Sequence, residues 1–262
     1  MQIPLFHVDA FTDRAFNGNP AAVCLLDSWL DDEWLRQVAA ESNLSATAFL
    51  VPRSDSYELR WFTPLCEIRL CGHATLAAAY VVLHVLHAGK DAVRFETRFG
   101  GTLLVQRDAT LFSMDFPALP PTRCVSPRCA LIEALEAAPV EVLEANDTYI
   151  AVFENHAAIE RLRPNFELLK TLHPLAVAVT AAGSGADFVS RYFAPSYGVP
   201  EDPVTGSVHC VLASYWSNRL SKSRLHARQL SERAGELWCE VAGERVILHG
   251  RAILTMQATL TL

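Results

Sequence analysis

Two short stretches of the sequence place small residues directly before a long apolar segment, with reactive side chains beside them. Cys71-Gly72-His73 precedes a run that ends near Gly89, and EDPVTGS, residues 201–207, precedes VHCVLASYWSNRL. The first turn of a helix carries unpaired N–H groups and the positive end of the helix dipole. Such an end can hold a carboxylate and stabilise the enolate that forms when a proton leaves the neighbouring carbon. The two stretches therefore predict proton chemistry on a carboxylic acid, with a purely structural helix start as the alternative.

The side chains near these helix starts are of types that move or hold protons. The carboxylate of Asp202 could act as an acid or base. The alternative for Asp202 is a solvated loop residue, or a charge that favours the helix dipole. His73 enters the first helix, where the dipole favours a neutral imidazole. Ser207 enters the second helix, where it could hydrogen-bond a substrate oxygen, and each of these residues could equally be a helix cap.

A cysteine is also found at the first helix start. Cys71 could be a thiolate, because helix N-termini lower the pKa of cysteine. A partner thiol at the second helix start would indicate a two-base racemase. The equivalent residue before Gly206 is Thr205, so the symmetric cysteine pair is absent.

Metal and nucleotide motifs do not occur near these stretches. His73, His84 and His87 do not form an HExxH or related set. Gly183-Ser184-Gly185 lacks the spacing of a dinucleotide or phosphate-binding loop. We therefore expect no metal, and we expect Gly183-Ser184-Gly185 to be a loop.

Composition excludes several classes of partner. The chain has 262 residues, of which 51% are hydrophobic, enough for a substantial core. Its net charge of −7 and its lack of a basic cluster argue against nucleic acid as a partner. The longest apolar run, Ala74 to Leu86, is shorter than the roughly 20 residues that cross a bilayer. Because the N-terminus lacks a signal peptide and the seven cysteines lack CxxC spacing, we expect a cytoplasmic protein. From the two helix starts described above, we expect its partner to be a small carboxylate-bearing substrate.

The elements that must position these residues alternate between strands and helices. Amphipathic spacing predicts a helix over Asp31–Ser42, and further helical patterns cover residues 126–137 and His156–Leu172. Strand patterns cover Gln2–Asp9, Ala21–Leu26, Ala46–Val51, Tyr57–Phe62, Val93–Glu96, Thr102–Gln106, Ala109–Phe116, Leu175–Thr180, Asp187–Phe193, Leu237–Val241, Arg245–Leu248 and Ile253–Leu260, and Val140–Phe153 is extended. The pattern is typical of an α+β protein.

The two helix starts suggest an internal duplication. Gly206 follows Gly72 by 134 positions, about half of the 262-residue chain. This offset predicts two pseudo-symmetric lobes, each a mixed β-sheet wrapped around a central apolar helix. We expect residues 1–118 to form the N-terminal lobe, which the C-terminal strand could complete, and residues 119–262 to form the C-terminal lobe.

Sequence blocks from end to end resemble the PhzF-like (phenazine biosynthesis-like) isomerase family. In order they are FHVDAFTDRAFNGNPAAVCLL, ESNLSATAF, LRWFTPLCEIRLCGHATLAAA, EDPVTGSVHC and RQLSERAGEL, and the pairing of LCGHAT with EDPVTGS is highly specific. The resemblance implies the diaminopimelate-epimerase-like fold, with the active site between two similar lobes, and is compatible with a homodimer.

The resemblance also implies roles for individual residues. In this family a glutamate is the acid/base that moves a proton on a small unsaturated or amino-bearing carboxylic acid, with no metal or cofactor. The residues lining the family's site match His73, Asp202 and Ser207, with backbone N–H groups of Gly72, Gly206 and Ser207 facing the substrate. Further substrate-binding candidates are Asn19, Gln229 and Arg233, for which a turn or strand role is the alternative.

The chain departs from the family pattern at the catalytic position. The family's S-E-T-A-F occurs here as Ser45-Ala46-Thr47-Ala48-Phe49, so Ala46 occupies the position of the glutamate. A methyl group carries no proton, and loss of a general acid/base costs about 10²- to 10⁴-fold in rate. Three explanations stay open: an engineered knockout, a divergent isomerase or lyase that uses Asp202, His73 or Cys71, and a catalytically silent protein that binds a small molecule or another protein. We favour an isomerase or epimerase with Asp202 as the acid/base.

Overall fold

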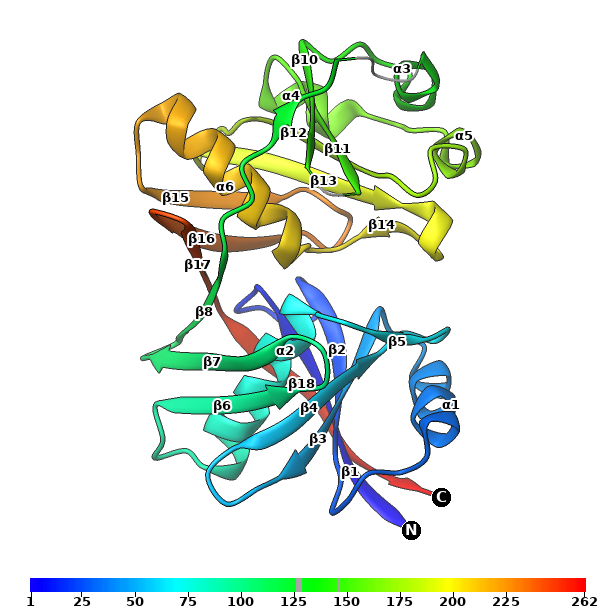
Figure 1. Ribbon diagram of the computed structural model, residues 1–262, viewed down its shortest axis with the longest axis vertical. Coiled ribbons are helices and arrows are strands. Elements are labelled where there is room, and N and C mark those ends of the chain that lie inside the picture. The colour runs from blue at the N-terminus through cyan, green and yellow to red at the C-terminus, as the bar shows by residue number, and fades with distance from the viewer. Residues whose placement is uncertain (126–128, 146) are drawn as a thin grey trace. The chain divides into compact units, whose positions relative to one another are not determined.

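The computed structural model describes residues 1–125, 129–145 and 147–262 (Figure 1). The chain divides into two compact units. Unit 1 comprises Met1–Asp115 and His249–Leu262, and unit 2 comprises Phe116–Leu248. Strand β18 (Ala252–Thr261) pairs antiparallel with β1 (Gln2–Ala10) along its length, so the C-terminal strand lies in unit 1.

Unit 1 contains a mixed sheet with the strand order β18-β1-β2-β3-β4-β6-β7-β8. The pairs β2–β3 and β4–β6 are parallel, and the other pairs are antiparallel. The remaining strands are β2 (Asn19–Leu25), β3 (Ala46–Pro52), β4 (Tyr57–Phe62), β5 (Glu67–Ile68), β6 (Ala92–Thr97), β7 (Gly101–Asp108) and β8 (Leu111–Pro117). Helix α1 (Asp32–Ser42) connects β2 to β3 and buries Leu35, Val38 and Ala39 against the sheet. Helix α2 (Gly72–Tyr80), continued by the π-helical segment Val81–Leu86, connects β5 to β6.

Unit 2 contains a second mixed sheet with the order β9-β10-β11-β12-β13-β15-β16. Its strands are β9 (Thr122–Arg123), β10 (Glu141–Ala145), β11 (Thr148–Val152), β12 (Ala176–Ala182), β13 (Phe188–Ala194), β14 (Val199–Asp202), β15 (Arg224–Gln229) and β16 (Gly235–Ala242), followed by β17 (Arg245–Gly250). Its helices are α3 (Cys129–Leu135), α4 (His156–Arg161), α5 (Phe166–Lys170), the 3₁₀ turn Pro195–Tyr197 and α6 (Gly206–Leu220). The parallel pairs are β11–β12 and β13–β15.

The order of elements is the same in both units. Each has an antiparallel hairpin, a helical crossover to a parallel strand, a second hairpin, a short strand, an apolar helix, and then a parallel and an antiparallel strand. In unit 1 the apolar helix α2 packs against β1, β2, β3 and β18, and in unit 2 α6 packs against β15 and β16 (Figure 1). The predicted α+β class is confirmed, and the pseudo-symmetry follows from this repeated strand order.

Some predicted elements are wrong in extent. The helix predicted over His156–Leu172 is two short helices, α4 and α5, because Pro164 lacks an N–H and disfavours helical backbone at the residue before it. The extended segment Val140–Phe153 is a hairpin of β10 and β11. Helix α3 starts at Cys129, and residues 126–128 of that predicted helix lie outside the described residues. Within the described part of the chain, every helix is too short or too polar to span a membrane.

Candidate functional site

Unit 1 brings together three residues that lie far apart in the sequence. Strands β2 and β3 are parallel and start near each other, with Ala21 facing Ala46 in the register. This pairing places Asn19, the first residue of β2, beside Ser45, which precedes β3: the Ser45 Oγ atom lies 2.9 Å from Asn19 Oδ1. Ser45 Oγ also lies 3.1 Å from Nε2 of His73, the second residue of α2. The predicted residues Asn19, Ala46 and His73 therefore occupy one end of the unit 1 sheet.

The hydrogen-bond geometry assigns the proton on His73. The two oxygens within reach of the Ser45 hydroxyl, Asn19 Oδ1 and the Pro20 carbonyl, are acceptors, so Ser45 donates to them. The Ser45 oxygen then accepts from His73 Nε2–H. The other ring nitrogen, Nδ1, lies 3.4 Å from Cys71 Sγ and is left as an acceptor for the thiol. The result is a polar line from Cys71 through His73 and Ser45 to Asn19.

Burial keeps His73 uncharged. Desolvation lowers the pKa of its imidazole to about 4, so the ring is neutral at physiological pH. The sequence argument attributed a neutral ring to the helix dipole, but burial is the cause in the structure. A neutral ring that donates from one nitrogen and accepts at the other can pass a proton or orient a neighbouring group.

Position 46 is a buried methyl group beside this polar line. Ala46 is fully buried as the first residue of β3. Because side chains alternate across a strand, Ala46 and Ala48 point to the same face of the sheet, and Ser45 and Thr47 to the other. The position carries no group that can gain or lose a proton, which is what the sequence motif predicts.

Unit 2 holds Asp202 at the start of α6 through a network of hydrogen bonds. Asp202 is the last residue of β14, and its Oδ2 accepts a 2.5 Å hydrogen bond from the Thr205 hydroxyl. The Thr205 N–H donates to Gln229 Oε1 at 2.9 Å. Gln229 Nε2 in turn donates to the Asp202 carbonyl at 2.7 Å and to Thr205 Oγ1 at 3.2 Å. The fully buried Gln229, at the end of β15, therefore fixes both the backbone and the side-chain partner of Asp202.

The other predicted residues of unit 2 lie close to this network. Gly206 is the first residue of α6 and is buried, and Ser207 follows it and is exposed. Arg233 lies in the turn between β15 and β16 and is partly exposed. Ser231, in the same turn, donates from its hydroxyl to the Pro203 carbonyl at 2.8 Å. This bond connects the turn that contains Arg233 to the segment that precedes α6.

A buried histidine in α6 was missed by the sequence analysis. His209 Nδ1 lies 2.7 Å from the Thr205 carbonyl, so this nitrogen is the donor, and Nε2 lies 3.4 Å from Ser190 Oγ. Burial lowers the pKa of His209 to about 4, although the hydrogen bond to Thr205 opposes the shift. The spacing of four residues between Thr205 and His209 is the only sequence signal for this hydrogen bond. Each unit thus places a neutral, buried histidine in the first turn of its apolar helix.

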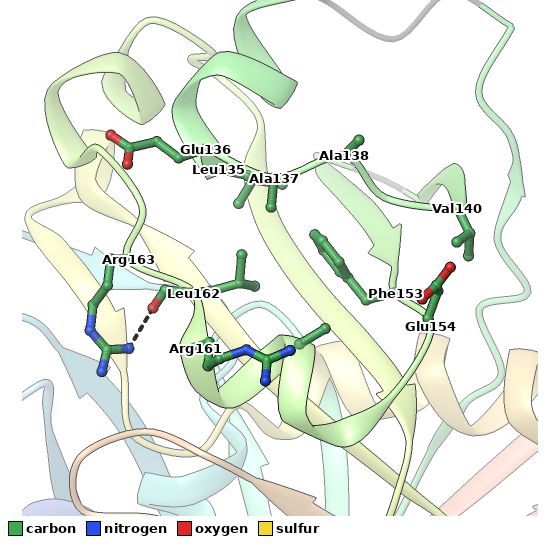
Figure 2. Close-up of a pocket in the computed structure, with 11 residues that line it drawn as sticks. Leu135, Glu136, Ala137, Ala138, Val140, Phe153, Glu154, Arg161, Leu162 and Arg163 are labelled. Atoms are coloured by element: carbon green, nitrogen blue, oxygen red, sulfur yellow. Dashed lines mark hydrogen bonds between the residues drawn. The ribbon is translucent and has the colours of Figure 1, made fainter.

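A pocket of unit 2 lies apart from the predicted residues. It has a volume of about 410 Å³ and contains none of the residues that the sequence singled out. Apolar side chains such as Phe153 and Leu162 line it, and the charged residues around it include Arg161 and Arg163 (Figure 2). Arg163 is held by the carbonyl oxygen of Leu162 at 2.8 Å. Among the described residues, no set of three His, Cys, Asp or Glu side chains is arranged to hold a metal ion.

Comparison with known proteins gives consistent matches over the whole chain. The family described as phenazine biosynthesis-like protein (PhzC-PhzF) matches residues 8–258. An uncharacterized isomerase of Pseudomonas aeruginosa is 52% identical over 262 residues, which is 100% of both chains. The crystal structure of a PhzF-family phenazine biosynthesis protein from Enterococcus faecalis has a TM-score of 0.95 and 40% identity, with 100% of each chain covered.

The fold extends to more distant epimerases. A hydroxyproline epimerase from Agrobacterium vitis, solved with bound trans-4-hydroxy-L-proline, has a TM-score of 0.65. It is 11% identical and covers 99% of this chain and 92% of its own. At this identity the similarity establishes a shared fold only.

Proposed function

The chain belongs to the phenazine biosynthesis-like (PhzC-PhzF) family, and from this premise we propose a cofactor-independent isomerase or epimerase that shifts a proton on a small carboxylic or amino acid. The family membership and the isomerase names of its relatives support the reaction class. The proposal assigns the proton transfer in this chain to Asp202, because Ala46 cannot perform it.

The observation that carries the proposal is the anchored carboxylate of Asp202. Its Oδ2 is held by Thr205, and Thr205 is held by the buried amide of Gln229. A general base must keep a fixed position relative to the carbon from which it takes a proton. A solvated loop carboxylate, one alternative considered from the sequence, would not need a buried threonine that is itself held by a buried amide.

The chemistry follows from the groups at the helix starts. In the proposed reaction the Asp202 carboxylate takes a proton from the carbon beside the substrate carboxylate. The enolate that forms is stabilised by the backbone N–H groups at Gly206 and Ser207, where α6 begins, and the protonated Asp202 carboxyl then returns the proton to another carbon on the same face. The Ser207 hydroxyl is proposed to donate a hydrogen bond to the substrate and Arg233 to help bind it, while the buried Gln229 holds the segment that carries Asp202.

The second candidate is a catalytically silent member of the same fold that binds a small molecule or a protein. The buried methyl group of Ala46 favours it, because the family's acid/base is missing while the surrounding polar line is retained. The two candidates differ in one property: only an enzyme exchanges a substrate C–H proton with solvent.

Deuterium exchange tests the proposal. The chain is incubated in D₂O with proline, trans-4-hydroxyproline and a panel of other amino and hydroxy acids, and the loss of the C–H signal beside each carboxylate is followed by NMR. Asp202→Asn is compared with Asp108→Asn, a control at the end of β7. We expect exchange by the unaltered chain that Asp202→Asn abolishes and Asp108→Asn does not.

Restoring the family's glutamate separates the alternatives. Exchange that occurs only in Ala46→Glu would show a disabled enzyme and would contradict the role given to Asp202. If no acid exchanges in the unaltered chain or in Ala46→Glu, the silent binding protein is the better description.

A further inference from the structure

A second internal repeat consists of residues to which no role has been given so far. Both units contain the pattern Arg-x-Phe-x-Pro, at residues 60–64 and 191–195. Each pattern is followed by a glutamate that stands five positions before the glycine of an apolar helix: Glu67 before Gly72, and Glu201 before Gly206. The first arginine lies on β4 and the second on the equivalent strand β13.

In unit 2 the arginine and glutamate form a forked ion pair. Arg191 Nε lies 2.7 Å from Glu201 Oε1, and Nη2 lies 2.8 Å from Oε2. The third nitrogen, Nη1, donates to the carbonyls of Leu162 at 2.9 Å and Ile159 at 3.3 Å, at the end of α4. Arg191 is 9% exposed, so the pair is largely shielded from water.

In unit 1 the same geometry recurs. Arg60 Nε lies 2.7 Å from Glu67 Oε1, and Nη2 lies 2.7 Å from Oε2. Arg60 Nη2 also lies 2.8 Å from Oδ1 of Asp32, the first residue of α1. Arg60 is buried to the same extent as Arg191, at 9% exposed.

Each arginine also packs on the phenylalanine of its own pattern. The Arg60 guanidinium lies 5.1 Å from the Phe62 ring, and that of Arg191 lies 5.0 Å from the Phe193 ring. Arg60 and Arg191 therefore each connect three elements. These are the strand that carries the arginine, the crossover helix of its unit, and the short strand that precedes the apolar helix. A planar guanidinium paired at two points fixes orientation as well as distance.

We propose that Arg60–Glu67 and Arg191–Glu201 are paired positioning residues, here called the two clamps. The clamp of unit 1 fixes β5 ahead of His73, and the clamp of unit 2 fixes β14, whose last residue is Asp202. The site roles of His73 and Asp202 rest on the proposed function, but the clamps themselves are a property of the fold.

A role in geometry explains the clamps better than a role in stability. Replacing a buried ion pair by apolar side chains of similar volume is often neutral or stabilising, because both charges must be desolvated. The chain nevertheless contains this ion pair twice, at equivalent positions of the two units and with the same two-point contact between guanidinium and carboxylate. What the pair provides and apolar residues do not is a fixed orientation for the adjoining segment.

Hydrogen exchange tests the clamps without requiring enzyme activity. Glu201→Gln keeps the shape of the side chain and removes its charge. We expect the backbone amides of residues 199–207, apart from Pro200 and Pro203, which have no N–H, to exchange about tenfold faster or more, which corresponds to about 1.4 kcal/mol of local opening. The control is Arg224→Met, which removes an arginine from an exposed ion pair with Glu240 in the same unit and should leave these amides unchanged. Glu67→Gln should have the equivalent effect on residues 67–75.

A conservative variant distinguishes the two-point contact of the Arg191 guanidinium from its positive charge. Arg191→Lys keeps the positive charge but cannot hold both carboxylate oxygens and both carbonyls at once, so it should loosen residues 199–207 nearly as much as Arg191→Met. The ring nitrogens of His209 report the same change by NMR, because its Nδ1–H bond to the Thr205 carbonyl depends on this segment.

Three results would overturn the proposal: unchanged exchange at 199–207 in Glu201→Gln, acceleration spread evenly over unit 2, or full retention of protection in Arg191→Lys. Failure of the proposed function would be seen separately, as absence of C–H exchange in any substrate while the local loosening is still present.

Discussion

The two buried histidines should make the stability of the chain depend strongly on pH. Burial lowers the pKa of His73 and of His209 from 6.5 to about 4. In the unfolded chain both rings bind a proton below about pH 6.5, whereas in the folded chain they remain neutral until about pH 4. The unfolded state therefore binds more protons in this window, and the free energy of unfolding falls as the pH falls through it.

The expected size follows from the same values. A lowering of the pKa from 6.5 to about 4 corresponds to about 3 kcal/mol for each ring, most of which is lost by about pH 4.5. Together the two rings should lower the free energy of unfolding by about 5 kcal/mol when the pH falls to about 4.5. This is a large part of the free energy of unfolding of a typical folded protein, about 5–15 kcal/mol. A smaller slope is expected from His7, whose pKa burial also lowers.

Urea unfolding at a series of pH values between about 7.5 and 4.5 measures this effect. His73→Gln and His209→Gln should each reduce the slope of unfolding free energy against pH by a similar amount. The double variant should retain only a shallow dependence. His226→Gln is the control, since this ring is only partly buried and pairs with Glu236. A flat profile in the unaltered chain, or a full slope in the double variant, would refute the reasoning.

Two further substitutions have expected effects on stability. Gln229→Leu removes a buried amide that accepts from the Thr205 N–H, so it should cost about 1–3 kcal/mol and speed exchange of that amide; unchanged exchange would contradict the network. Gly250→Ala should cost about 1–3 kcal/mol in thermal or urea unfolding, because its Cβ would lie 2.6 Å from a Phe11 ring carbon. Gly89→Ala, where a Cβ meets no atom within 4 Å, is the matched control and should be close to neutral.

The local part of the fold was predictable from the sequence. Strand-like residue patterns located β3 and β4, and amphipathic spacing located α1, because these signals lie within one element. The duplication was visible in the spacing of Gly72 and Gly206, which open α2 and α6 in the structure. The break at Pro164 could have been predicted, since proline interrupts a helix.

The contacts within the candidate site were not predictable in the same way. Thr205 and Gln229 are 24 positions apart, and their hydrogen bond depends on β15 lying next to β13. His209 sits in an apolar helix, where a single histidine carries no local sign that its ring bonds to Thr205. The clamps were present as a repeated pattern of residue types, but only the fold shows that each arginine meets its glutamate.

The central claim is that Asp202 moves a proton in this chain, and the rate of solvent deuterium incorporation beside a substrate carboxylate tests it most directly. For an acid that exchanges, the account predicts that Asp202→Asn lowers the rate by about 10²- to 10⁴-fold while the fold is retained. Equal rates in the unaltered chain and in Asp202→Asn would contradict it.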